Sequence, residues 1–130
     1  MAQDVRGRLA AGAIRGIPPA PPRFASPAPP HVLRSAMTRD VALERDADGL
    51  RSALAVITRL QTASSEPALL NMAAAAKLVA AGALARQESR GGHWRSDFPQ
   101  TDKTSHRTFM TLADADRIAA SAEARRRASL

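Results

Sequence analysis

The feature that most constrains this fold is an apolar, alanine-rich run, PALLNMAAAAKLVAAGALARQES, at residues 67–89. Alanine has the highest helix propensity, so the run predicts a long helix that begins in the turn containing Pro67. An α-helix that is apolar on all sides is normally covered by several neighbours. This helix therefore has more apolar surface than a small chain can easily cover. Its larger side chains point in three directions: Leu69, Met72 and Val79 in one, Leu70 and Leu84 in a second, and Leu78 in a third.

Two shorter helices are predicted before this run. The stretch HVLRSAMTRDV has apolar residues at three-to-four spacing, which predicts a first helix over residues 31–40. A second helix follows ALERDADG, where Asp46 or Asp48 can accept a hydrogen bond from the free amides at its N-terminus. It should end near Gln61. One face of this second helix is apolar and consists of Leu50, Ala53, Leu54, Ile57 and Leu60.

The two ends of the chain differ from this helical middle. Most of the nine prolines lie before residue 31, and proline removes amide donors and biases the preceding residue away from helix. We expect residues 1–30 to hold the end of a helix and a proline-rich linker, and residues 31–112 to form a helical domain. Residues 113–130, with Ile118 but few other large apolar side chains, should form a charged, frayed tail. The predicted fold class is all-α, a small antiparallel three-helix bundle with a proline-rich N-terminal extension.

The charge balance leaves more than one class of partner open. The formal net charge of the 130-residue chain is +7, nearly all from arginine, which suggests nucleic acid, an anionic membrane or an acidic protein as a partner. Many arginines stand beside an acid, as in TRDVALERDADGL, so a solvated helix surface explains most of the surplus. Arg125–Arg127 could contact phosphate. A small basic protein that binds nucleic acid or an acidic partner stays open as an alternative, as does a truncated or mispredicted reading frame without a function.

Several classes of protein are excluded or not expected. Cysteine is absent, which excludes disulfides and thiolate metal sites. We expect no membrane span, because no apolar run approaches the length of about 20 residues that a bilayer requires. Arg6, Arg8 and Arg15 interrupt any signal-peptide core near the N-terminus. We therefore expect a cytoplasmic protein.

The stretch RQESRGGHWRSDFPQTDK, residues 86–103, concentrates the groups that could carry chemistry. Ser89, His93 and Asp97 are the residue types of a hydrolase triad, but no nucleophile elbow surrounds the serine. A metal site is a second candidate, but the spacing of its residues matches no compact ligand pair. We therefore expect neither a catalytic residue nor a metal ligand. The four residues considered for a metal are His93, His106, Asp97 and Asp102.

Guanidinium, carboxylate and aromatic groups in this stretch suggest a different role. Arginine can form two-point hydrogen bonds to carboxylates and can bind backbone carbonyls. Trp94 and Phe98 would cost stability if they were left in water. A loop of this composition is normally held against another surface, and the rest of the chain offers little second surface. The groups concerned are Arg86, Arg90 and Arg95, with Glu88 and Asp97 available as internal partners.

The same stretch resembles a known family. ARQESRGGHWRSDFPQTD is similar to the segment near the end of L-aspartate oxidases, in which Arg-x-Glu-Ser-Arg-Gly-x-His-x-Arg-x-Asp-Phe/Tyr-Pro closes the last long helix. The related flavoproteins of succinate dehydrogenase and fumarate reductase usually continue into Arg-Asp-Asp, whereas Gln100-Thr101-Asp102 stands here, which favours the oxidase. Upstream, LRSAMTRDVALERDADGLRSAL and LLNMAAAAKLVAAGALARQESRG resemble further stretches of the family, with Ala42 in place of a usual glycine. The resemblance covers residues 2–112.

This resemblance implies the C-terminal helical domain of an enzyme that uses FAD to oxidise L-aspartate to iminoaspartate, for quinolinate and NAD synthesis. It also implies that AQDVRG lies part-way along a helix of the flavin domain, and that the flavin-binding and catalytic parts precede it. FAD would then belong to the parent enzyme, with no cofactor bound by this chain, and the partner would be the flavin-binding domain rather than nucleic acid. The implied role is structural, a docking motif made of Glu88, Ser89, Arg90, His93, Arg95 and Asp97.

Overall fold

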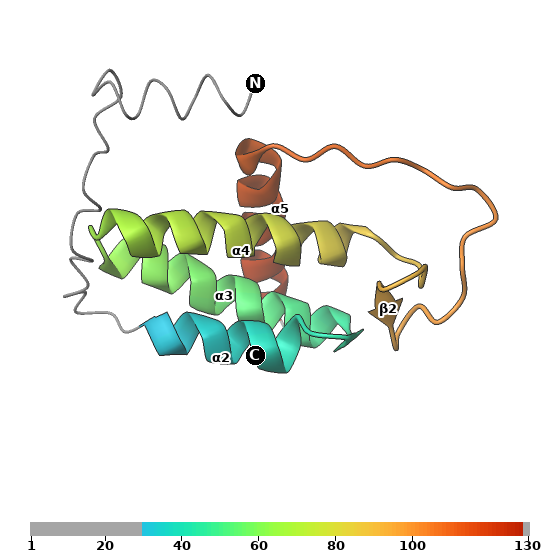
Figure 1. The fold of residues 1–130 in the computed structure, drawn as a ribbon, viewed down its shortest axis with the longest axis horizontal. Coiled ribbons are helices and arrows are strands. Elements are labelled where there is room, and N and C mark those ends of the chain that lie inside the picture. The colour runs from blue at the N-terminus through green and yellow to red at the C-terminus, as the bar shows by residue number, and fades with distance from the viewer. Residues whose placement is uncertain (1–29, 129–130) are drawn as a thin grey trace, which may run out of the picture.

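The computed structural model describes residues 30–128, so the expected helix end and most of the proline-rich linker at residues 1–29 lie outside the described part, as do residues 129 and 130. The described chain is mainly helical, which confirms the all-α prediction (Figure 1). Its elements are α2 (Pro30–Asp40), β1 (Glu44–Arg45), α3 (Ala47–Ala63), α4 (Pro67–Ala85), β2 (Trp94–Arg95) and α5 (Leu112–Ala128).

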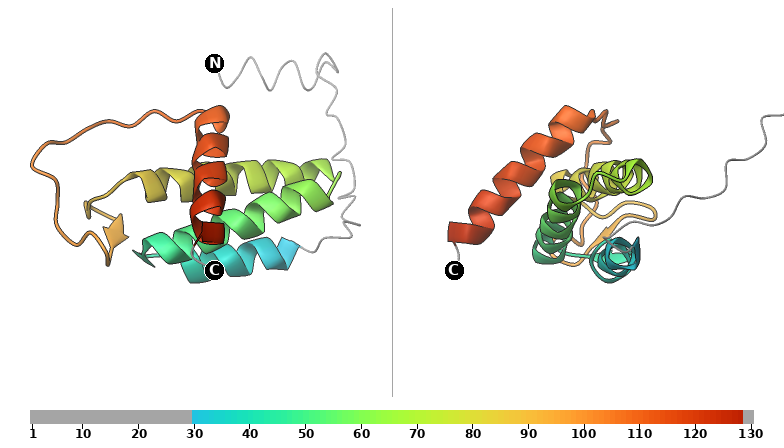
Figure 2. Two further views of the ribbon diagram at one scale, coloured as in Figure 1. Left: turned by 180° about the vertical axis from the view of Figure 1, so that it is seen from behind. Right: turned by 90° about the vertical axis from the view of Figure 1, so that its left-hand side faces the viewer.

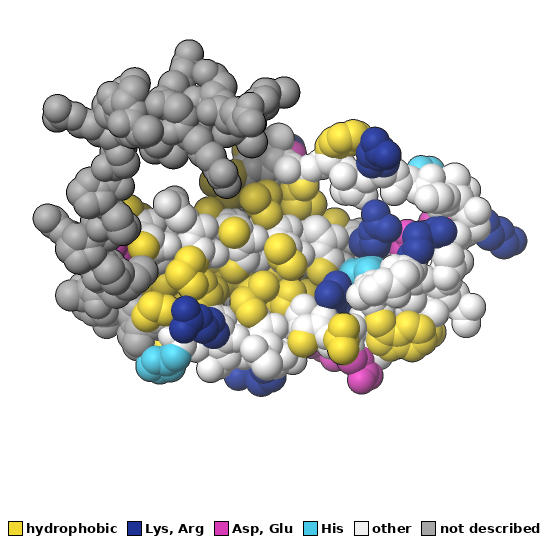
Figure 3. All heavy atoms as spheres, in the orientation of Figure 1, with side chains coloured by type: hydrophobic (Ala, Val, Ile, Leu, Met, Phe, Trp, Pro, Cys, Tyr) yellow, Lys and Arg dark blue, Asp and Glu magenta, His cyan; other side chains and the backbone are white. Residues whose placement is uncertain are grey.

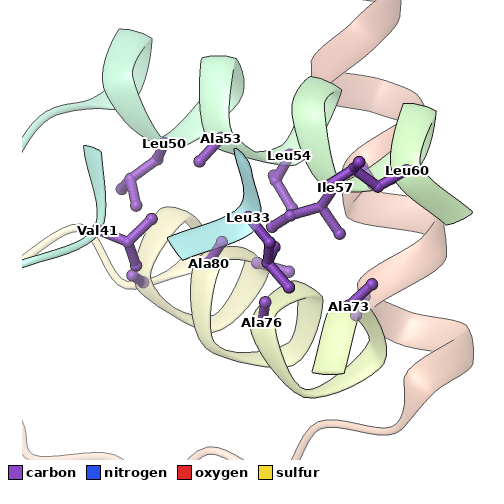
Figure 4. Close-up of a cluster of buried hydrophobic side chains, with 14 of the residues drawn as sticks. Leu33, Val41, Leu50, Ala53, Leu54, Ile57, Leu60, Ala73, Ala76 and Ala80 are labelled. Atoms are coloured by element: carbon purple, nitrogen blue, oxygen red, sulfur yellow. The ribbon is translucent and has the colours of Figure 1, made fainter. Parts of the chain in front are cut away.

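Helix α3 lies at the centre of the arrangement and packs against α2, α4 and α5. Helix α5 crosses the α3–α4 pair on the side opposite α2, so the described part has a fourth helix where three were predicted (Figure 2). The apolar face predicted for α3 is buried in full and points toward α4 and toward Leu33 and Val41 (Figure 4). Leu50, Leu54 and Ile57 are among the largest fully buried side chains.

Helix α5 differs from the frayed tail that we expected over residues 113–130. It is a regular helix, and Ala115, Ala119 and Ala122 form a buried stripe on it. Such a stripe lets helices approach closely, but it is not evident when a sequence is searched for large apolar side chains. Thr111 and Asp114 cap the N-terminus of the helix reciprocally, since each backbone amide binds the other side chain, at 2.9 and 3.2 Å.

Helix α4 begins at Pro67 as predicted but ends at Ala85, before the predicted limit of residue 89. By length and composition it could cross a membrane, contrary to our expectation for the chain. In this structure it packs against α3 and α5 as a core helix. Its single charged residue, Lys77, is only 7% exposed, and its Nζ atom lies 2.7 Å from an oxygen of Asp116 on α5.

The two short strands were not predicted. They pair in parallel, with Glu44 opposite Trp94 and Arg45 opposite Arg95. The pairing brings the loop after α2 against the loop after α4. The stretch rich in charged and aromatic groups is therefore held against a second surface of the same chain, where the sequence suggested that little such surface exists.

Candidate docking motif

The motif loop, defined here as residues 86–102, leaves the end of α4 and turns back in a tight hairpin. Arg90 and His93 exchange two backbone hydrogen bonds across the turn, of 2.8 and 3.1 Å. Gly91 has φ 58°, a left-handed conformation that glycine adopts without steric cost. Gly91 and Gly92 therefore form the turn of this hairpin.

Arg95 lies at the centre of the loop and is only 1% exposed. Its Nη1 atom donates to the carbonyl oxygens of Ala83 at 2.9 Å, Leu84 at 3.2 Å and Arg86 at 3.1 Å. These carbonyls have no amide partner within α4, because they belong to its last turn and to the residue after it. A guanidinium there also complements the partial negative charge of the helix end.

Asp97 connects this helix end to the start of α3. Its carboxylate receives two hydrogen bonds from Arg95, both 2.7 Å long, and a third, of 3.0 Å, from the backbone amide of Ala47. The hydrogen bonds from Arg95, with that of the amide, lower the pKa of Asp97 although partial burial acts to raise it. The ring of Phe98 lies under the guanidinium, with 5.0 Å between its centroid and Cζ of Arg95.

Glu88 organises the outer part of the loop. One oxygen accepts from Arg86 at 3.2 Å, and the other accepts from Nε of Arg90 at 2.9 Å and from the amide of Asp102 at 3.0 Å. Burial acts to raise the pKa of Glu88, but the amide of Asp102 and the two guanidinium groups outweigh it, so that the pKa lies below its ordinary value. The two ends of the loop are therefore joined through one carboxylate.

Ser89 holds the inside of the loop together and is buried. Its hydroxyl donates to the carbonyl of Phe98 at 2.9 Å and accepts from the amide of Arg95 at 2.8 Å. Its own backbone bonds to Gln100 and Thr101, at 3.0 and 2.6 Å. The serine therefore fixes the loop conformation, and its oxygen is surrounded by backbone rather than by a general base.

His93 joins the loop to the end of α2 through Arg45. Nη1 of Arg45 lies 2.8 Å from Nδ1 of His93, while its Nε donates to the carbonyls of Val41 and Ala42 at 3.1 and 2.6 Å. A guanidinium can only donate, so Nδ1 must accept and the proton sits on Nε2, 3.4 Å from the carbonyl of Arg86. Burial lowers the pKa of His93, and the nearby guanidinium groups lower it further, against the opposing effect of that carbonyl.

The six predicted motif residues thus belong to one network, and it joins the ends of α2 and α4 to the start of α3. Arg45 belongs to this network and was not predicted. Its contact is made with a residue that lies 48 positions away in the sequence. Its only sequence signal was its place in the VALERDADG stretch, which supported the family resemblance without indicating a contact.

The other chemistries considered from the sequence are not supported by this geometry. Ser89, His93 and Asp97 bind other partners rather than one another. Within residues 30–128, no three His, Asp or Glu side chains come together as metal ligands would. The loop residues instead hydrogen-bond to the end of α4 and the start of α3.

The N-termini of α3, α4 and α5 do not fit the phosphates of a dinucleotide cofactor. Such cofactors place their pyrophosphate on the free amides of a helix N-terminus. The N-terminus of α3 is capped by Asp46 and also bound by Asp97. Glu66 stands at the N-cap of α4, and Asp114, in the first turn of α5, binds the amide of Thr111 just before that helix. Carboxylates at these three ends would repel phosphate.

Comparison with known proteins places the sequence of this chain in a family. Residues 67–125 match the family described as "Fumarate reductase flavoprotein C-term". No solved structure matches the chain.

Individual relatives are longer proteins. The chain is 43% identical over 116 residues to the L-aspartate oxidase of Rhodospirillum rubrum, covering 82% of this chain and 42% of the relative. It is 50% identical over 80 residues to that of Caulobacter vibrioides, covering 62% of this chain and 15% of the relative. The chain is 31% identical over 118 residues to the L-aspartate oxidase of Mesorhizobium japonicum, covering 88% of this chain and 21% of the relative. The chain therefore spans less than half the length of these relatives. It carries the C-terminal domain of the L-aspartate oxidases, in the succinate dehydrogenase and fumarate reductase flavoprotein superfamily.

Proposed function

We propose that this chain is the C-terminal docking domain of an enzyme that uses FAD to oxidise L-aspartate to iminoaspartate. The product would feed quinolinate and NAD synthesis in the cytoplasm. The observation that carries the proposal is the identity of 43% and 50% to two L-aspartate oxidases. The flavin-binding domain would supply the cofactor and the catalytic groups, and no step of the reaction is assigned to the described residues. We further propose that α2, α3 and α4 correspond to an antiparallel three-helix bundle in that domain, with α5 added to it.

In this proposal, the six motif residues act in two stages. Their hydrogen bonds first fix the loop, as the two-point pair between Arg95 and Asp97 illustrates. The fixed loop then presents its outer side to the flavin-binding domain, including Trp94, which is 49% exposed. A tryptophan in this position is typical of residues that contribute strongly to an interface. The residues that hold the loop are Glu88, Ser89, Arg90, His93, Arg95 and Asp97.

Co-expression tests this proposal directly. The full chain would be produced together with the flavin-binding part of the Caulobacter vibrioides L-aspartate oxidase, without that protein's own matching segment. We expect a yellow complex that oxidises aspartate, while the chain alone is colourless and inactive. Failure of the two to copurify, or a chain that alone binds flavin and makes peroxide from aspartate, would contradict the proposal.

The net charge of +7 supports a second candidate, a small basic protein that binds nucleic acid or an acidic partner. The structure gives this alternative less support than the sequence did. Arg126 and Arg127 both bind Glu123, at 3.2 and 3.1 Å, so that part of their charge is compensated. A titration against DNA at increasing salt separates the candidates, because binding through phosphate contacts weakens steeply with salt.

A further inference from the structure

Helix α4 has its charge on the inside and its uncharged residues on the outside. Lys77 is its only charged residue, and it is buried against Asp116 of α5. The opposite side, here named the outer face of α4, is exposed or half-buried, and Val79 at its centre is 53% exposed. The outer face consists of Asn71, Ala75, Leu78, Val79 and Gly82.

Solvent alone does not account for such a face. A surface helix of a soluble protein normally carries charged residues on its exposed side, and 24% of this chain is charged. Figure 3 shows hydrophobic side chains gathered over α4 and beside it, while Lys, Arg, Asp and Glu side chains lie around this area rather than within it. Single exposed apolar residues are common on proteins, but a contiguous uncharged area of this kind marks an interaction surface.

We propose that the outer face of α4 is the surface on which the flavin-binding domain packs. This inference rests on the proposed function and adds to it the location of the main contact. The matched relatives are more than twice as long as the aligned segment, so the family contains a larger body that could cover the face. Helix α4 also begins at residue 67, where the family match begins, and it continues directly into the motif loop.

The residue types on this face favour a protein over a membrane. Membrane-binding helices present bulky apolar side chains with lysine and arginine on the adjoining face. The outer face has instead Ala75, whose small size lets a rigid surface come close to the helix backbone, while Gly82 lies beside the side chain of Met110. Leu78 and Val79 together offer apolar surface to the partner. We therefore expect a closely packed contact with folded protein, in which the motif loop fixes the orientation and α4 supplies most of the buried apolar area.

Charge substitution on the outer face tests this inference. The full chain carrying Val79→Asp would be co-expressed with the flavin-binding part of the Caulobacter vibrioides oxidase, and the affinity of the purified complex would be measured. Because an unpaired carboxylate buried in an interface is costly, we expect the dissociation constant of the complex to increase at least about tenfold. Ala75→Asp should act similarly. Ala124→Asp, on the exposed side of α5, is the matched control and should change the affinity less than about twofold. Circular dichroism of the free variants checks that each remains folded.

The outcomes separate this inference from the proposed function. If the unmodified chain does not bind the flavin-binding part, both are rejected. If it binds and Val79→Asp binds equally well, the proposed function stands and the outer face is not the contact. If the chain alone forms dimers, and Val79→Asp converts them to monomers without weakening the complex with the flavin-binding part, the face would belong to an interface with a second copy. The chain would also be tested for flotation with vesicles of phosphatidylcholine and phosphatidylglycerol. If the chain floats, and Val79→Asp abolishes flotation without weakening the complex, the outer face of α4 would be a membrane contact and the inference would be overturned.

Discussion

Arg95 and Asp97, two residues apart, form a two-point ion pair in which both hydrogen bonds are 2.7 Å long. Each partner also binds a different helix end. Arg95 binds the last carbonyls of α4, and Asp97 binds the amide of Ala47 at the start of α3. One ion pair therefore fixes the relative position of two helices.

Replacing Arg95 should destabilise the domain strongly. Arg95→Ala removes the guanidinium donor from three carbonyls at the end of α4 and two of the three hydrogen bonds to Asp97, and removing one partner of a buried pair costs about 3 kcal/mol or more. Arg95→Lys keeps the charge but loses the two-point geometry, so its free energy of unfolding should lie between those of the unmodified chain and Arg95→Ala. Urea denaturation of the full chain measures both. A loss below about 1 kcal/mol for Arg95→Ala would show that the junction contributes little.

Acid should weaken the domain through Asp97 and Glu88. The pKa of each carboxyl group is lowered in the folded state, so the unfolded chain binds protons first as pH falls. The stabilisation is complete above the ordinary carboxyl pKa of about 4 and is lost as pH falls through the lower folded values. Urea midpoints measured from neutral pH to about pH 2 should decline in that range. Asp97→Asn should be less stable at neutral pH and show a shallower decline, and an unchanged slope would contradict this.

His93 should add a pH dependence in a higher range. Its pKa is lowered in the fold, so its contribution is complete above the ordinary histidine pKa of about 6.5 and decreases as pH falls below it. Nitrogen NMR should find the proton on Nε2 at neutral pH, because Nδ1 accepts from Arg45. His93→Gln should flatten the stability profile between about pH 5 and 7. His106→Gln, at an exposed position, serves as the control and should leave the profile as it is.

The alanine stripe of α5 should tolerate no larger side chain. Ala115 is fully buried, so Ala115→Leu should force α5 away from its neighbours and cost about 1–3 kcal/mol. Ala124→Leu, on the exposed side of the same helix, should stay within about 0.5 kcal/mol of the unmodified chain. Urea denaturation measures both. Equal effects of the two substitutions would mean that α5 is not packed as described.

The sequence predicted those parts of the fold that depend on local periodicity. The face of α3 from Leu50 to Leu60 repeats with the helical period and is made of large side chains, so it could be recognised directly. The α5 stripe follows the same period, but alanine occurs as often in exposed helices, and its burial becomes evident only from the neighbours. The end of α4 could not be located because it depends on Arg95, which lies ten residues beyond Ala85.

The motif residues were identified from a resemblance, while their contacts were not. The hydrogen bond between Ala47 and Asp97 joins positions 50 residues apart, and that between Arg45 and His93 joins positions 48 apart. Neither residue pair shares a local pattern that would bring it together. The sequence indicated little second surface for the loop within the chain. The pairing of β1 with β2 creates that surface, and no local pattern predicted this pairing.

The register of that pairing places Arg45 directly beside Arg95. Like charges at neighbouring positions would normally repel one another. Here the guanidinium of Arg95 binds carbonyl oxygens at the end of α4 and the carboxylate of Asp97, while that of Arg45 binds the carbonyl oxygens of Val41 and Ala42, just after α2. An anion such as a dicarboxylate could recruit either arginine only by breaking these hydrogen bonds, so the two are poor candidates for substrate recognition, despite their chemistry and their proximity.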